Sequence, residues 1–306
     1  MSAFPSSSQV VQQRARPGRP WFYLSAPTAF VLPAALLILA ITIFPSLWAL
    51  VLSVFQWDLQ NPEHPFVGLA NYVAVLADPL TSGSARFTLL MVVALVMIDL
   101  AAGMSLALLL SGDRPGKGLF TAIFLLPVMV SPVVAGYAWR IMFDTRVGPI
   151  NHLVSLVSGV PTFIPWLNDP TLSTIAIVLV NIWQSTPFMF LTILAGLSAV
   201  DPEYYEAGAL DGATPWQVFW FLTIPLIRPV LLVAVLFHSI AVLNMFGEVF
   251  VITRGGPGTS TQTIAYHIYQ TGFLDFRWGY TSAASFLFLG FTVAVASLVL
   301  RRVRET

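Results

Sequence analysis

The sequence predicts an all-α polytopic membrane protein with six transmembrane helices, and three observations lead to this prediction. First, its 306 residues are 57% hydrophobic and only 9% charged, whereas an average globular domain carries about 25% charged residues. Second, the mean hydropathy of +0.82 is too apolar for a water-soluble enzyme or a disordered chain. Third, the apolar residues fall into six long stretches, each close to the roughly 20 residues with which a helix crosses a bilayer.

These stretches are expected to be helices, because apolar runs of this length without alternation favour helices over strands. Prolines inside or near them are compatible with membrane helices, since neighbouring helices can satisfy the freed backbone groups. The expected spans cover about residues 30–54, 87–110, 119–143, 172–200, 226–252 and 281–300. They belong to one transmembrane domain, residues 21–300, which lies between a flexible basic tail at residues 1–20 and a short tail at residues 301–306.

Lysine and arginine residues set the expected orientation, because cytoplasmic loops carry an excess of them. With a cytoplasmic N-terminus, the inner side holds Arg14, Arg16, Arg19, Arg114, Lys117, Arg228, Arg301, Arg302 and Arg304. The smaller outer set is Arg86, Arg146, Arg254 and Arg277, with Arg140 near the outer end of the third span. We therefore expect both termini in the cytoplasm and the chain in the cell inner membrane as a multi-pass protein.

Composition disfavours several kinds of site. The chain has no cysteine, so it has no disulfide, thiolate metal site or cysteine nucleophile. Its four histidines are scattered, so no helical metal site is predicted. The formal net charge of zero argues against nucleic-acid binding. The segment G-D-R-P-G-K-G at residues 112–118 has neither the spacing nor the final Ser or Thr of a phosphate-binding loop, so this chain is not expected to hydrolyse ATP.

The loop between the fourth and fifth spans, residues 201–224, is expected to hold two short helices joined by a bend. Asp201 can cap a first helix that begins with Pro202, and Gly212 is placed to end it. Thr214 and Gln217 then repeat the start signal as a capping box. Small residues in this loop would allow another protein to approach closely, but an ordinary hairpin at the membrane surface accounts for the same local signals.

The same loop resembles the EAA loop of ABC importer permeases. The family pattern is roughly E-A-A-x-x-D-G-A followed by F, I and P, and this chain carries E-A-G-A-L-D-G-A followed by Phe219, Ile224 and Pro225. Gly208 stands where the family usually has its second Ala. In that family the loop is a coupling helix that docks in a groove on the ATPase subunit. The resemblance implies an ATPase-coupling set of Glu206, Ala207, Gly208, Asp211, Gly212 and Ala213.

Other segments resemble the carbohydrate-uptake permeases of the maltose/glycerol-3-phosphate type. They are F-V-G-L-A-N-Y at residues 66–72, G-P-I-N at 148–151, T-R-G-G-P at 253–257 and Y-H-I-Y-Q-T-G-F at 266–273. The resemblance extends over about residues 21–300 and implies the type I ABC importer permease fold. It also implies a second homologous permease, two copies of a cytoplasmic ATPase that binds ATP and Mg, and an extracytoplasmic solute-binding protein. No cofactor is expected on this chain.

Polar residues inside the spans are candidates for a solute pathway, because polar groups at mid-membrane are costly. Planar polar groups and aromatic faces usually hold sugars, and the fourth and fifth spans carry both. Positions counted from the family's W-x-x-x-P turn and T-x-G-G-P loop give the candidates Gln184, Ser185, Phe188, His238, Ala241, Val242 and Asn244. Polar residues in such bundles also bond neighbouring helices to one another. Asp99 is expected to pair with another helix, and Glu248 to serve as a gate or interface residue.

Two kinds of function stay open at this point. An ATP-driven, binding-protein-dependent importer of a sugar or sugar-like solute, working by alternating access, accounts for both the hydropathy and the loop. A proton-coupled secondary transporter that uses Asp99 or Glu248 accounts for the hydropathy but not for the loop. Importers of amino acids or metals in the same superfamily are a milder alternative. A membrane enzyme is disfavoured, because no clustered His, Asp and Glu set is present, and no catalytic residue is predicted.

Overall fold

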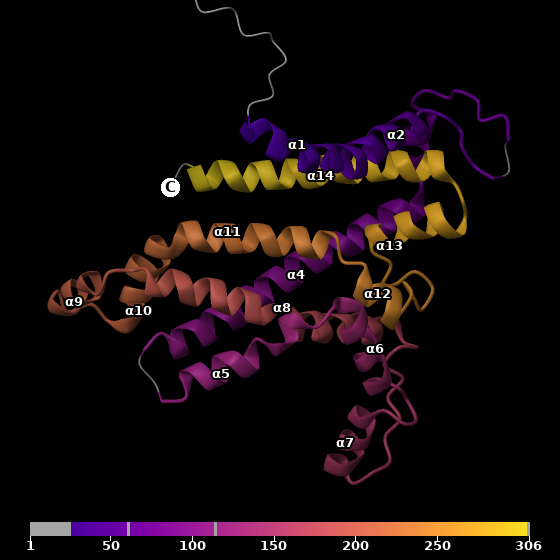
Figure 1. Cartoon of the computed structure of the whole chain (residues 1–306). Coiled ribbons are helices and arrows are strands. Elements are labelled where there is room, and N and C mark those ends of the chain that lie inside the picture. Colours follow the sequence, from indigo (N-terminus) through magenta and orange to yellow (C-terminus); the bar gives the residue numbers. More distant parts are fainter. Residues whose placement is uncertain (1–25, 60–61, 113–114, 305–306) are drawn as a thin grey trace, which may run out of the picture. The chain divides into compact units, whose positions relative to one another are not determined.

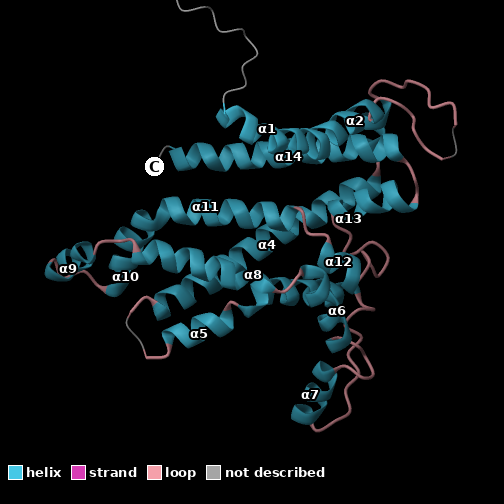
Figure 2. Ribbon diagram, in the orientation of Figure 1, coloured by secondary structure: helices cyan, strands magenta, loops and turns pink. Residues whose placement is uncertain are grey.

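The computed structural model describes residues 26–59, 62–112 and 115–304, and every element named within them is a helix or helical turn (Figures 1 and 2). These residues divide into two compact units between Trp48 and Ala49, and each unit is described by itself. Within the described part, five helices are long and apolar enough to cross a membrane, and a bent helix pair makes a sixth crossing if it counts as one span. The predicted all-α polytopic fold is confirmed.

The first unit contains an apolar helical span, Phe30–Leu52, that continues into the second unit. It consists of α1 (Ala26–Ile38), a π turn (Leu39–Ile43) and α2 (Phe44–Leu52). The π turn ends two residues before Pro45, which cannot donate the regular helical hydrogen bond and whose ring crowds the preceding turn. The basic tail expected at residues 1–20 lies outside the described residues.

The core of the second unit is a bundle of three helices: α4 (Pro79–Leu110), α8 (Pro170–Ser198) and α11 (Ile224–Leu243). Each packs against the other two (Figure 1). Met104 and Phe190 belong to the buried apolar cluster that they share. Gly103 allows α4 and α8 to approach closely, because a Cβ atom at this position would lie only 2.9 Å from the backbone nitrogen of Phe190.

Both α4 and α8 begin before the apolar stretches that predict them. An aspartate followed by proline starts each helix: Asp78 accepts a hydrogen bond from a backbone amide of the first turn of α4, and Asp169 does the same for α8. This combination favours helix initiation. The helix α4 therefore starts at Pro79 rather than near residue 87, and its polar first turns include the buried side chains of Thr81 and Ser84.

The third apolar stretch is not the continuous span, residues 119–143, that the sequence predicts. It consists of α5 (Lys117–Phe124), a 3₁₀ turn (Leu126–Met129) and α6 (Pro132–Met142), with a bend of 96° before α6. Val130 and Ser131 have extended backbones at this bend. A residue before proline is driven out of the α region by contact with the proline ring, so Pro132 breaks the span.

The fifth apolar stretch is longer than the expected residues 226–252 and is also broken. It begins with α10 (Pro215–Gln217), continues through a π turn (Val218–Thr223) and α11, and ends with α12 (Gly247–Ile252). The second short helix of the preceding loop is therefore continuous with the span. Residues 244–246 leave the helical path between α11 and α12.

Short helices of the second unit lie at the two ends of its bundle. In Figure 1, α9 (Pro202–Leu210) and α10 lie at one end, and α12 and α13 (Ile264–Tyr269) lie at the other. A π turn (Gln270–Leu274) leads from α13 to α14 (Trp278–Arg304), which packs against α3 (Ala70–Ala77), α11 and α13. The separate helix α7 (Pro149–Ser158) follows α6. The helices α9 and α12 thus lie at opposite ends of the bundle, as expected if the bundle crosses a membrane.

A hydrogen-bond cluster around Asp78 joins α4, α13 and α14. The Tyr280 hydroxyl donates to Asp78 Oδ2 at 2.6 Å, and Thr81 Oγ1 lies 2.7 Å from Tyr280 Oη and 3.0 Å from His267 Nε2. Burial by itself would raise the pKa of Asp78, but hydrogen bonds from Tyr280, Leu80 and Thr81 outweigh that effect and lower it. Burial lowers the pKa of His267, which favours its neutral form.

Candidate functional site

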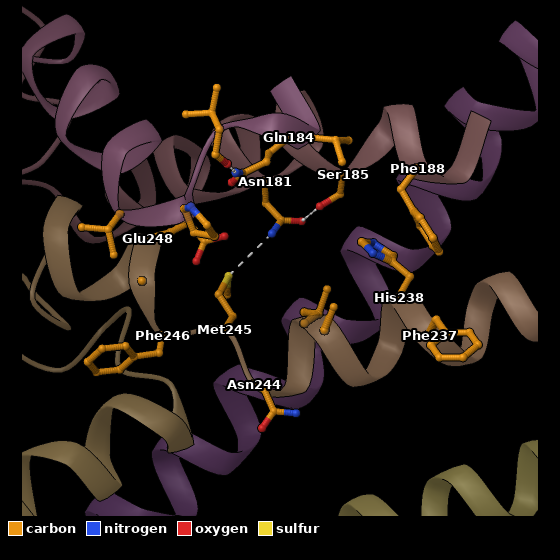
Figure 3. Close-up of a pocket in the computed structure, with 17 residues that line it drawn as sticks. Asn181, Gln184, Ser185, Phe188, Phe237, His238, Asn244, Met245, Phe246 and Glu248 are labelled. Atoms are coloured by element: carbon orange, nitrogen blue, oxygen red, sulfur yellow. Dashed lines mark hydrogen bonds between the residues drawn. The ribbon is translucent and has the colours of Figure 1, made fainter. Parts of the chain in front are cut away.

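A cavity of about 570 Å³ lies beside α8, α11 and the two helix breaks (Figure 3). Every residue that the sequence analysis named for a solute pathway lines this cavity: Gln184, Ser185, Phe188, His238, Ala241, Val242 and Asn244. Three come from α8 and the others from the last turns of α11 and its end. Residues that are distant in the sequence thus meet at one site, and contact with a solute remains a prediction for each of them.

The α8 wall of the cavity is polar. Asn181, Gln184 and Ser185 are spaced three and four residues apart, so they share one face of the helix. Figure 3 shows them side by side, with Ser185 Oγ donating to Asn181 Oδ1 at 3.4 Å and Asn181 Nδ2 lying 3.9 Å from Met245 Sδ. Gln184 Nε2 donates to the Val130 carbonyl at 2.6 Å, whereas its Oε1 is buried without a partner in the described part of the chain. The α8 wall therefore brings three polar side chains to the cavity.

The α11 and α12 wall contains the second helix break. Asn244 ends α11, and its side-chain amide donates to the Ile240 carbonyl at 2.8 Å. Glu248 follows in the first turn of α12, where it is 7% exposed and within reach of Asn181. The sequence analysis expected Glu248 to be a gate or interface residue, and the structure makes it part of the cavity wall.

The two helix breaks meet at the cavity. Pro132 lies beside Gly247: a Cβ atom on that glycine would be 3.2 Å from Pro132 Cβ. Val130 and Asn244, one at each break, both line the cavity. Non-helical backbone at membrane depth is tolerated where it is buried in protein or lines a cavity. Transporters characteristically build their binding sites from such discontinuous helices.

Sequence reasoning missed part of this wall. Val128, Val130, Pro132 and Val133 line the cavity, although the sequence analysis placed them within a continuous span. The pair of prolines at positions 127 and 132 could have indicated the helix break, since the second proline forces the preceding residue out of the helix.

Behind the cavity, His238 is paired with a residue of α4. Its Nε2 lies 2.8 Å from Asp99 Oδ2, and the Thr186 hydroxyl of α8 donates to Asp99 Oδ1 at 2.6 Å. Exposed fractions are 3% for His238 and 0% for Asp99. The expectation that Asp99 pairs with another helix is confirmed, and it pairs with two.

The cavity combines aromatic rings with neutral polar groups. Phe188, Phe237 and Phe246 line it together with the amides and the hydroxyl of the α8 wall. Neither lysine nor arginine is found among the described residues that line it. The one lining histidine, His238, already faces the Asp99 carboxylate. Such a site suits a solute with many hydroxyl groups and no negative charge, because an anion would meet no unpaired cation.

The loop at the other end of the bundle has the predicted local structure. Asp201 caps α9 by accepting from the Glu203 amide, and Thr214 forms the expected capping box with Gln217. Between them Gly212 has φ +73°, and the amides of Gly212 and Ala213 donate back to the last turn of α9. A left-handed glycine with these bonds ends a helix in the Schellman manner. The two short helices and their glycine bend are confirmed.

This loop and the turns that follow expose a large amount of apolar surface. Leu210 is 89% exposed and Phe221 is 80% exposed. Trp216 is 70% exposed and packs against Phe219 and Trp220. Contiguous exposed apolar side chains of this kind mark contact surfaces for proteins or lipid. Within the set that the sequence analysis assigned to coupling, Gly208 has an open environment, and a Cβ atom there would make ordinary contacts at 3.8 Å.

The chain is similar to known transport proteins over nearly its whole length. It is 33% identical to a probable ABC transporter permease, y4oQ of Sinorhizobium fredii, over 97% of this chain and 94% of that protein. It is 34% identical to the trehalose/maltose transport system permease MalF of Thermococcus litoralis, over 84% of this chain and 86% of that protein.

A solved structure shares the fold. The structure of a bacterial ABC transporter involved in the import of the acidic polysaccharide alginate matches 90% of this chain and 94% of its own with a TM-score of 0.78 and 20% identity. The family described as the binding-protein-dependent transport system inner membrane component matches residues 21–305. The chain is thus a multi-pass membrane transport subunit that belongs to the family of binding-protein-dependent transport system inner membrane components.

Proposed function

We propose that this chain is a permease subunit of an ATP-driven, binding-protein-dependent importer, and that the cavity between α8 and α11 carries an uncharged sugar. The observation that carries the proposal is the meeting of two helix breaks at a cavity that is lined by polar side chains and aromatic rings. Discontinuous helices next to a polar cavity are a recurrent way of building a solute site within a membrane.

The chemistry of the cavity supports a sugar as its solute. Sugars have apolar ring faces and hydroxyl edges, and the cavity offers phenylalanine rings beside Asn181, Gln184 and Ser185. Glu248 is the one carboxylate at the wall, and no described lysine or arginine accompanies it. A phosphorylated or acidic sugar would lose its hydration here without meeting an unpaired cation, so a neutral mono- or oligosaccharide is favoured. A relative at 34% identity is named for trehalose and maltose transport.

The proposed importer contains further subunits. A second, homologous permease would complete the pathway, two copies of a cytoplasmic ATPase would bind ATP and Mg, and an external solute-binding protein would deliver the sugar. The absence of a nucleotide motif in this chain supports a separate ATPase. The exposed apolar surface around Leu210, Trp216 and Phe221 supports the docking of a protein at the loop end of the bundle.

Alternating access would link the loop to the cavity. The residues from Glu206 to Ala213 would contact the ATPase, and closure of the ATPase pair on ATP would move α9 and α10. Because α10 is continuous with the span that contains α11, such a movement would reach the cavity along one element. Sugar delivery and ATP binding must favour the same conformation, since a ligand shifts an equilibrium only by its differential affinity.

Co-purification tests the proposed assembly. The chain is tagged at its C-terminus, extracted from its native membrane in several mild detergents and analysed by mass spectrometry. We expect a second permease and an ABC ATPase to be recovered with it. Recovery of the chain alone, or only as a homo-oligomer, in every detergent would contradict the proposal and would favour a secondary transporter.

Uptake by the assembled importer tests the proposed solute class. Proteoliposomes that contain the co-purified complex and its binding protein are supplied with labelled trehalose, maltose or glycerol 3-phosphate. We expect ATP-dependent uptake of at least one neutral sugar and little uptake of the phosphorylated solute. Uptake that survives ATP removal but collapses with the proton gradient would contradict the importer mechanism.

A further inference from the structure

Asp99 is a buried carboxylate that faces a cavity residue without lining the cavity itself. It is 0% exposed on α4, whereas the residues of the cavity wall come from α8, α11 and the two breaks. Its Oδ2 lies 2.8 Å from His238 Nε2, and neither atom has a hydrogen-bond partner among the described residues. Asp99 can therefore influence a solute only through His238.

A contact this short is favourable only when one of the two groups carries a proton. At 2.8 Å, an unprotonated ring nitrogen and a carboxylate oxygen would bring two lone pairs together, which is repulsive. The second carboxylate oxygen is held by the Thr186 hydroxyl at 2.6 Å. This hydrogen bond fixes the rotation of the carboxylate, so that Oδ2 is directed at the imidazole. The three side chains come from three helices of the core bundle.

We propose that Asp99 is a positioning residue for solute recognition: with Thr186 it fixes the orientation and protonation of the His238 imidazole in the cavity wall. This inference rests on the proposed function, because it assigns His238 a role toward the transported sugar. With Nε2 engaged by Asp99, Nδ1 is the ring nitrogen that is left for a solute. A fixed donor or acceptor can discriminate between sugars that differ in the orientation of their hydroxyl groups.

A purely structural role for Asp99 makes a different prediction. If the Asp99–His238 contact only joined helices, its loss would lower the uptake of every sugar by the same factor. If Asp99 acts through His238, its loss changes the ratio of uptake rates between two sugars that are delivered by the same binding protein. A double-mutant cycle separates the two roles, since residues that act as one unit are non-additive.

The first experiment measures competitive uptake of trehalose and maltose by the assembled importer. We expect Asp99→Asn and His238→Gln each to change the trehalose-to-maltose ratio about tenfold, the scale of one lost hydrogen bond to a charged group, and the double variant to change it no further. Thr186→Val is expected to produce a smaller change in the same direction. The matched control is Thr192→Val, whose hydroxyl donates to the Phe188 carbonyl of its own helix at 2.8 Å.

An equal loss of uptake for both sugars in Asp99→Asn, or a further change of the ratio in the double variant, would overturn the proposal. If the unmodified importer takes up neither sugar, the proposed solute class is wrong, and the inference is then decided by spectroscopy alone. Thr186→Val supplies the same comparison if Asp99→Asn does not assemble.

The spectroscopic experiment needs no transport. When only this chain of the complex in lipid nanodiscs carries ¹⁵N-labelled histidine, the spectrum shows four imidazoles, and His238→Gln identifies the signals of His238. We expect the Nε2 signal to report a shared proton in the unmodified protein and to shift in Asp99→Asn and in Thr186→Val, but not in Thr192→Val. Identical His238 signals in all of these proteins would overturn the proposal.

Discussion

The buried carboxylate of Asp99 and the half-buried carboxylate of Asp78 each lie beside other polar side chains. Asp99 faces His238 and Thr186, and Asp78 accepts from Tyr280. Burial of an unpaired carboxylate in a membrane domain would cost several kcal/mol. The same pairing accounts for Asp99 without proton coupling, although that residue was the main sequence feature available to a proton-driven transporter.

The buried histidine of the Asp78 cluster predicts a pH dependence of stability. Burial lowers the folded-state pKa of His267 below 6.5, so the unfolded chain binds more protons than the folded chain below that pH. The free energy of unfolding should therefore be highest above about pH 6.5 and should fall as the pH falls through the lowered pKa. His267→Gln removes this group, so thermal unfolding measured between pH 8 and pH 5 should show a shallower decline.

The matched control for that measurement is His152→Gln, at an exposed position of α7. It removes a histidine outside the cluster, so the stability of this variant should decline with falling pH as steeply as that of the unmodified protein. An equally steep decline in His267→Gln would contradict the assignment of the acid sensitivity to His267.

At the scale of helices, the packing of α4 on α8 depends on one glycine. A Cβ atom at Gly103 would lie 2.9 Å from the Phe190 nitrogen and 3.0 Å from the Met189 carbonyl carbon, so helix backbone would have to move. Gly103→Ala should lower the free energy of unfolding by about 1–3 kcal/mol, as overpacking usually does. Gly83→Ala on the same helix meets nothing within 4 Å and should be neutral or slightly stabilising. Thermal unfolding of the two purified variants makes the comparison, and equal melting temperatures would contradict it.

The bend between α9 and α10 provides a test of the coupling role. Gly212 has φ +73°, which a β-branched residue adopts only at a cost of roughly 1–2 kcal/mol. Gly212→Val should therefore distort the bend and reduce both ATP-dependent uptake and recovery of the ATPase, while insertion in the membrane is retained. Gly118→Val, outside the coupling set, is the matched control, since a Cβ atom at Gly118 meets nothing within 4 Å. Normal uptake by Gly212→Val would count against the proposed docking of this loop.

Local sequence signals predict some helix boundaries in this chain but not others. The helix caps at Asp201 and Thr214 and the bend at Gly212 follow from nearby residues, and the structure has all three. The break at Ser131 and Pro132 was not predicted, because hydropathy is continuous across it, although proline chemistry contained the signal. Hydropathy does not predict the early start of α4, because the first turns of this helix are polar. Their side chains are buried by tertiary contacts, which a local sequence pattern does not show.

At the scale of the whole molecule, the fold brings together residues whose proximity does not follow from their spacing in the sequence. The α8 and α11 candidates were named from a family resemblance, and the structure puts all of them on one cavity. The Val130 carbonyl and the Asp99–His238 pair belong to the same region, but they depend on which faces of α4, α6, α8 and α11 meet. Side-chain periodicity within one span does not determine that choice.

The central claim is that a sugar crosses the membrane through the cavity between α8 and α11. Ala241 lines this cavity, and Ala241→Trp would fill part of it with an indole ring. Ala294→Trp places the same ring at an exposed position of α14 and serves as the control. Both variants are assembled with the co-purified subunits, and ATP-dependent uptake of the preferred sugar is measured in proteoliposomes. We predict that Ala241→Trp lowers uptake about tenfold or more, equivalent to about 1.4 kcal/mol, while the complex stays assembled and Ala294→Trp retains its uptake. Full uptake by an assembled Ala241→Trp importer would contradict this pathway.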